Sequence, residues 1–136
     1  MVGWLPWRAA RDHETLVIEF GDLPDGTGAA WFRDESGDLI VLDRRLRRRA
    51  RKGALAHELV HVERGIGWGA ATSATMQVEE RVVRRETARR LVPPGMLRRF
   101  VDRRVDCEPV TAGLVADEFD VPVEVAGLAL ELLRGW

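Results

Sequence analysis

The chain has 136 residues and a formal net charge of −1, with 21 Lys and Arg against 22 Asp and Glu. This length suffices for one hydrophobic core and is short for two ordinary domains, so we expect residues 1–136 to form a single domain. Apolar residues make up 46% of the chain, but the longest apolar runs, such as Leu39–Leu42, are far too short to cross a bilayer. The balanced charge also gives no general attraction to the phosphates of nucleic acid.

The N-terminus and the single cysteine indicate a cytoplasmic protein. Met1–Asp12 holds two tryptophans and a proline, whereas a secretory signal needs a basic start followed by an apolar stretch. Cys107 is the only cysteine, so no internal disulfide can form, which agrees with a reducing compartment. We therefore expect the protein to be located in the cytoplasm.

Three short segments in the first third of the chain have the composition of strands. Thr15–Phe20 is rich in apolar and β-branched residues and stops at Gly21. Ala29–Arg33 and Leu39–Asp43 flank a short polar link with a glycine, Asp34–Gly37, and we expect them to form a hairpin. These segments predict a short antiparallel sheet.

The rest of the chain has the spacing of helices. From Leu46 onward apolar residues recur at helical intervals, and the first long helix is expected to end at Gly65. The further predicted helices are Ser73–Leu91, Gly95–Arg104, Thr111–Phe119 and Val123–Leu133. A small sheet followed by helices is an α+β arrangement, in which we expect residues 105–136 to form a C-terminal helical pair packed on the rest.

The first long helix carries the run His57-Glu58-Leu59-Val60-His61, an H-E-x-x-H motif. Residues four apart lie on one helical face, so both imidazoles can bind one cation at about 2.0–2.1 Å. Glu58 is rotated by about 100° from His57, which directs its carboxylate beside the metal. The motif predicts a zinc site with His57 and His61 as ligands and Glu58 as general acid and base. The alternative is an ordinary helix with two surface histidines.

A catalytic zinc ion usually has three protein ligands, so a third ligand is expected elsewhere in the chain. No histidine follows at the usual third position, and residues 44–101 contain no aspartate, so glutamates remain. Glu63 points away from the helical face that carries the histidines. The candidates on the next predicted helix are Glu79, Glu80 and Glu86. Spacing alone does not separate Glu79 from Glu80.

Three patterns together carry a resemblance to a known family. They are the run Leu55–His61, the pattern Glu80-x-x-Val83, and the stretch Ala88–Pro93. This order resembles the ImmA/IrrE family of bacterial and phage metallo-endopeptidases. In that family the glutamate that opens the second pattern is a zinc ligand and lies thirteen residues before the proline, which implies Glu80 here. The chain departs from the family at Val83, where alanine is preferred, and at Glu86, where phenylalanine is common.

The resemblance implies a zincin-like fold, zinc as the cofactor, and endopeptidase activity on a protein substrate. Members of the family cleave a transcriptional repressor, here expected to be a helix-turn-helix protein that controls a phage, a mobile element or a stress response. No direct contact with nucleic acid or membrane is expected. The alternative from another class is a metal-binding regulator that binds a repressor or partner protein without cleaving it. A fourth protein ligand, in place of an open coordination position, would favour that alternative.

Hydrolysis also needs groups that hold the substrate. Zinc peptidases often use Tyr or His for the developing oxyanion, but the chain has no tyrosine. His13, an arginine, backbone N–H groups or zinc alone remain, and we expect His13 to face solvent in the loop before the first strand. An extended peptide would pair with an exposed edge strand, for which Ala29–Arg33 and Leu39–Asp43 are the candidates.

Charge is unevenly distributed along the sequence. Seven of the nine residues in Arg44–Lys52 are basic, and beyond Arg104 seven acidic residues are opposed by Arg134 alone. We expect the basic run to be a solvated helix entry beside the substrate cleft, with nucleic-acid binding as the alternative. The acidic charge of the terminal helices opposes DNA binding and favours packing or partner docking.

Overall fold

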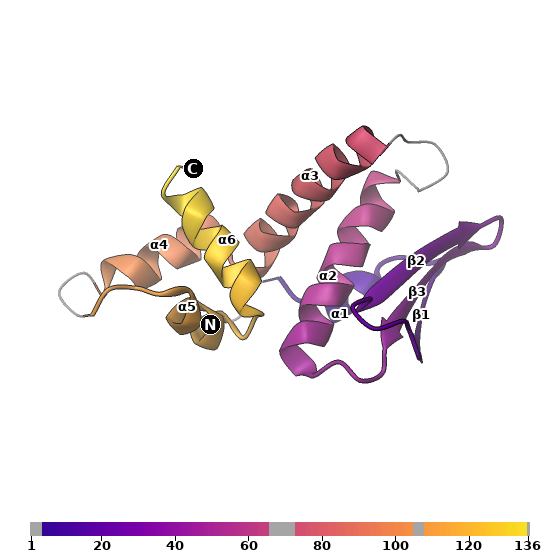
Figure 1. The fold of residues 1–136 in the computed structure, drawn as a ribbon, viewed down its shortest axis with the longest axis horizontal. Helices are drawn as coiled ribbons and strands as arrows, with labels where there is room; N and C mark the ends of the chain where they lie inside the picture. The colour runs from indigo at the N-terminus through magenta and orange to yellow at the C-terminus, as the bar shows by residue number, and fades with distance from the viewer. Residues whose placement is uncertain (1–3, 66–72, 105–107, 136) are drawn as a thin grey trace.

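A computed structural model of the protein describes residues 4–65, 73–104 and 108–135. A short helix and three strands precede the longer helices, and Figure 1 shows α2 between the sheet and helices α3–α6. The elements are α1 Pro6–Arg11, β1 Leu16–Gly21, β2 Ala29–Asp34, β3 Gly37–Asp43, α2 Arg48–Arg64, α3 Ser73–Leu91, α4 Pro94–Asp102, α5 Ala112–Phe119 and α6 Val123–Leu133. The predicted α+β fold class is confirmed.

The sheet has the strand order β1-β3-β2 and is mixed. Strands β2 and β3 pair antiparallel as the predicted hairpin, whereas β1 pairs parallel with β3. Strands β1 and β2 are not neighbours in the sheet, because β3 lies between them. Since β2 runs antiparallel to both, β1 and β3 run in the same direction. The prediction of a wholly antiparallel sheet is therefore wrong. Since β3 is central, the proposal that Leu39–Asp43 is an exposed edge is also wrong, and β2 is an edge strand.

The hairpin turn follows from its polar residues and its glycine. The Asp34 carboxylate accepts hydrogen bonds from the backbone N–H and the hydroxyl of Ser36, at 2.8 and 2.6 Å. Gly37 has φ of +137°, and a Cβ there would collide with the carbonyl oxygen of Thr15. Only glycine fits this close approach between the turn and the start of β1.

Helix α2 packs against both halves of the molecule. Leu55, Leu59 and Val62 face the sheet, where they form one hydrophobic cluster with the fully buried Ile40 and Leu42. A second cluster joins α2, through Ala56, to apolar residues of α3–α6. Burying a leucine side chain contributes about 1.5–3 kcal/mol, so each cluster stabilises the position of α2. The two clusters fix α2 at the centre of the fold.

The helix boundaries largely agree with the predicted ones. Gly65 ends α2 with φ of +71°, and its N–H donates to the His61 carbonyl oxygen at 2.9 Å. Helix α3 has the predicted bounds. Helix α1 was not predicted, because six residues beginning at a proline are too few to show a helical period. None of the helices in the described ranges is long and apolar enough to span a membrane, and Cys107 lies outside those ranges.

The basic start of α2 is ion-paired with the acidic end of α5. Arg48 and Arg49 donate to the Asp120 carboxylate at 2.7 and 2.9 Å, and Arg49 also contacts Asp117 at 2.9 Å. The Lys52 ammonium donates to the Asp120 carbonyl oxygen at 3.2 Å. The arginines are partly exposed, as expected, but this part of the basic run is matched by the acidic C-terminal charge rather than only solvated.

Candidate metal centre

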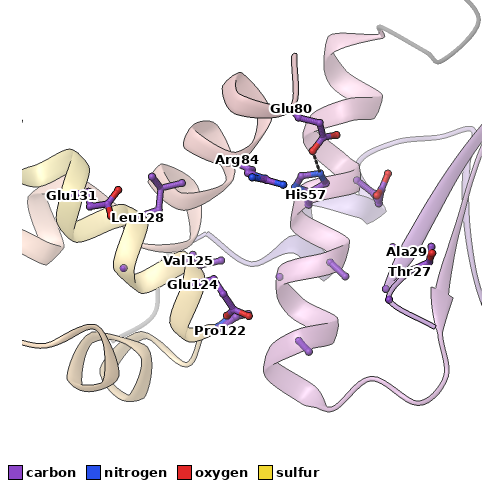
Figure 2. Close-up of a pocket in the computed structure, with 17 residues that line it drawn as sticks. Thr27, Ala29, His57, Glu80, Arg84, Pro122, Glu124, Val125, Leu128 and Glu131 are labelled. Atoms are coloured by element: carbon purple, nitrogen blue, oxygen red, sulfur yellow. Dashed lines mark ion pairs between the residues drawn. The ribbon is translucent and has the colours of Figure 1, made fainter. Parts of the chain in front are cut away.

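Three side chains from α2 and α3 converge on one point. The Nε2 atom of His61 lies 2.7 Å from one carboxylate oxygen of Glu80, and Nε2 of His57 lies 3.1 Å from the other. Figure 2 shows Glu80 directed at His57. The ligand atoms of the three residues all lie within 4.8 Å of one another. Two imidazoles and a carboxylate therefore share a site that could bind a metal ion.

The donor set and its spacing fit zinc. Two histidines and one glutamate are a common ligand set of catalytic zinc sites. Donor atoms at the corners of a tetrahedron around such an ion would lie about 3.3 Å apart, given bonds of about 2.0–2.1 Å. The contacts of Glu80 with His57 and His61 at 3.1 and 2.7 Å would need to open by about 0.2 and 0.6 Å, and all three donors already lie within 4.8 Å of one another. These residues thus fit the metal that the motif predicts.

Helix geometry and the neighbouring sheet orient the two histidines. Their rings lie one turn apart with centroids separated by 4.9 Å. The His61 side chain is only 8% exposed and stacks on Trp31 of β2 at 6.3 Å. Trp31 is held in turn, because its indole N–H donates to Asp38 at 2.8 Å. Sequence reasoning missed this role of Trp31, since no spacing signal connects residues thirty positions apart.

The structure places Glu80, and not Glu79, beside the histidines. The buried Glu79 accepts a hydrogen bond from Arg64 at 2.9 Å, and this ion pair lowers the pKa of Glu79. Glu63 and Glu86 also lie elsewhere, since both contact Arg90. The carboxylate of Glu80 is therefore the one directed at the histidines, whereas that of Glu79 is directed at Arg64.

Glu58 lines the same cavity as His57 and Glu80. Burial, together with the negative charge of Glu80, raises the pKa of Glu58 to about 7. A carboxyl group with this pKa can both accept and release a proton near neutral pH. Burial lowers the pKa of His57, and the charge of Arg84 adds to this effect. The imidazole is therefore held in the neutral form that binds metals.

The site opens into a cavity of about 1040 Å³. Its floor is α2, where Ala50, Gly53 and Ala54 leave room above the helix. One wall is the segment 26–29 that leads into the edge strand β2, and the other is α6, as Figure 2 shows. The shape can hold a polypeptide segment between a strand edge and a helix.

Among residues 4–65, 73–104 and 108–135, no fourth His, Cys, Asp or Glu joins the three-residue group. The stretch 66–72 contains none of these residue types. A tetrahedral zinc ion held by these three residues would thus have one position without a ligand from the described residues.

No protein-family model and no curated protein matches the chain. The H-x-x-x-H spacing on α2 and the glutamate on α3 are consistent with a zincin-like site.

Proposed function

We propose that the protein is a zinc-dependent endopeptidase, with His57, His61 and Glu80 as zinc ligands and Glu58 as general acid and base. The observation that carries the proposal is the convergence of these three donors beside Glu58 in an open cavity. A purely structural metal site has no need of a fourth, ionisable side chain beside an accessible coordination position. Hydrolysis needs both.

The residues divide the chemistry between them. Zinc bound by such a set supplies Lewis acidity, which lowers the pKa of water to about 7 and polarises a peptide carbonyl. The Glu58 carboxylate takes a proton from the attacking water, holds it, and gives it to the nitrogen of the leaving amine. Its place in the cavity with His57 and Glu80 suits both transfers.

The cavity suits an extended segment of a protein substrate. Because β2 is an edge strand and the residues before it line the cavity, a substrate backbone can pair with its free N–H and C=O groups. The resemblance to ImmA/IrrE peptidases supports a transcriptional repressor as the substrate and the cytoplasm as the location. Pairing of this kind recognises main chain, so sequence preference must come from the cavity walls.

Metal analysis and one substitution test the core of this proposal. Protein purified without chelator should hold close to one equivalent of zinc by elemental mass spectrometry. Glu58→Gln should keep that zinc and slow cleavage by about 10²–10⁴-fold, because it removes the acid and base but no ligand. The substrate would be the repressor encoded beside the gene, co-expressed and mapped by mass spectrometry. Normal cleavage by Glu58→Gln would refute the mechanism, and zinc binding without cleavage of any target would favour the non-cleaving regulator.

Glu79 and Glu80 provide a matched pair of variants. Glu80→Gln should weaken zinc binding by at least about tenfold, since it removes a charged ligand. Glu79→Gln removes an adjacent carboxylate that contacts Arg64 instead, and should leave zinc affinity nearly unchanged. The reverse result would show that Glu79 is the ligand.

A further inference from the structure

We propose that Arg84 is a catalytic residue that binds the oxyanion formed when the scissile carbonyl is attacked; this inference rests on the proposed peptidase function. Arg84 lies on α3 and lines the cavity that contains His57, Glu58 and Glu80. Of the described residues that line this cavity, it is the one Lys or Arg. Its place beside the metal site is the observation that carries the inference.

Helix geometry brings Arg84 to the reacting end of the cavity. Glu80 and Arg84 are four residues apart on α3, so they lie on one face with a rise of about 6 Å between them. Figure 2 shows the guanidinium end of Arg84 directed toward His57. A carbonyl group held next to the metal ligands would thus meet the guanidinium.

The guanidinium of Arg84 is free to bind a substrate oxygen. Glu80, the nearest carboxylate along the helix, is engaged with both histidines. Within the described ranges Arg84 forms no ion pair, whereas Arg64 on α2 and Arg90 on α3 pair with glutamates. Arg84 is also exposed, so it has no role in the hydrophobic core. An exposed guanidinium without an ion pair costs little stability, and its N–H donors remain available to a substrate oxygen.

The other candidates for this role are placed elsewhere or absent. The chain contains no tyrosine. His13 lies 3.8 Å from Glu63 and does not line the cavity. Of the side chains that the sequence suggested for the oxyanion, only an arginine is present at the cavity, and that arginine is Arg84.

The reaction creates the charge that Arg84 would bind. The water oxygen forms a bond to the carbonyl carbon, and the π electron pair moves to the carbonyl oxygen. The pair returns as the C–N bond breaks, and the amine leaves with the proton that Glu58 took from water. Guanidinium N–H groups donate charge-assisted hydrogen bonds to the oxygen while it is negative. A buried oxyanion donor contributes about 10²–10³-fold to kcat, so the exposed Arg84 should contribute about 10–100-fold.

The test compares Arg84→Ala, Arg84→Lys and the control Arg81→Ala, an exposed arginine on the same helix that does not line the cavity. The zinc-loaded proteins are assayed on a pool of quenched fluorogenic peptides. Arg84→Ala should lower kcat by about 10–100-fold with a smaller change in KM, and lysine should restore part of the loss. Arg81→Ala should behave as wild type. Zinc content should be equal in all four proteins.

A binding measurement gives a readout independent of turnover. A phosphonamidate analogue of the cleaved peptide presents a tetrahedral anion, whereas the matching hydroxamate binds metal without one. Arg84→Ala should weaken the phosphonamidate by about 10–100-fold and the hydroxamate by less than about threefold. Equal kcat and equal phosphonamidate affinity in Arg84→Ala and wild type would overturn the proposed role of Arg84 and leave the peptidase function standing. A wild-type protein that binds zinc and cleaves neither peptides nor repressor would overturn the peptidase function, and this inference with it.

Discussion

Replacing Glu58 by glutamine should stabilise the zinc-free protein at pH 8 and leave its stability nearly unchanged near pH 4.5. Burial and the charge of Glu80 raise the pKa of Glu58 to about 7 in the folded state. In the unfolded chain this carboxyl group is solvated and has its ordinary pKa of 4.5. Folding above pH 7 must therefore either bury a charge or bind a proton.

The size of the effect follows from the difference in pKa. Each pKa unit corresponds to 1.36 kcal/mol, so a rise from 4.5 to about 7 destabilises the folded state by about 3 kcal/mol above pH 7. Between pH 4.5 and 7 the folded state holds more protons than the unfolded state, so stability falls as pH rises. Glutamine neither titrates nor carries a charge, so the stability of the Glu58→Gln protein does not show this decline with pH.

Urea unfolding followed by tryptophan fluorescence, in buffer with EDTA, measures the difference at pH 4.5, 6 and 8. The advantage of Glu58→Gln should grow with pH and level off above pH 7. Glu14→Gln, at an exposed position, serves as the control for removing one negative charge. An advantage that is the same at all three pH values, or a loss of stability at pH 8, would refute the reasoning.

Three further predictions concern packing and charge, each measured by urea unfolding. Gly53→Ala should lower the free energy of unfolding by about 1–3 kcal/mol, because its Cβ would lie 2.8 Å from the proline before α6. Gly95→Ala, with open space around it, should instead raise the free energy of unfolding by about 0.5–1 kcal/mol. Asp120→Asn keeps a residue suited to φ of +56° and should lose about 1 kcal/mol in low salt and less in high salt. Asp43→Asn should lower the free energy of unfolding at neutral pH, and this loss should shrink below pH 4, because hydrogen bonds and an ion pair with Arg45 hold the pKa of Asp43 well below its ordinary value.

Features that depend on neighbouring residues could be predicted from the sequence. Gly65 ends α2 and the paired prolines follow α3, because a left-handed cap and a missing N–H act within one turn. The H-x-x-x-H spacing placed both histidines on one face for the same reason. The hairpin followed from Asp34–Gly37, where the turn residues act on their own backbone.

Features that depend on distant residues could not be predicted in this way. Strands β1 and β3 are separated in the sequence by β2, and no local signal in the sequence encodes their parallel pairing. Glu79 and Glu80 differ by one position on α3, which changes direction by about 100°, so a small error in the packing of α3 exchanges their roles. The positions of Trp31 and Arg84 at the site likewise depend on how β2 and α3 pack against α2.

The arrangement around α2 would separate the proposed metal binding from the proposed substrate binding. Rotation of about 100° per residue puts Leu55 and Leu59 on the sheet side, Ala56 on the side of the C-terminal helices, and both histidines between these two packed faces. The proposed zinc ligands come from α2 and α3, but the far wall of the cavity is α6. The start of α6 is joined to α2 through Asp120 and the Gly53 contact. Changes at Asp120 or Gly53 should therefore alter the cavity and peptide cleavage while zinc affinity stays constant, which equilibrium dialysis and peptide hydrolysis on the same samples can measure. Equal losses of zinc affinity and of cleavage activity would instead mean that the two packed faces of α2 are coupled, so that a change at one disturbs the metal site as well.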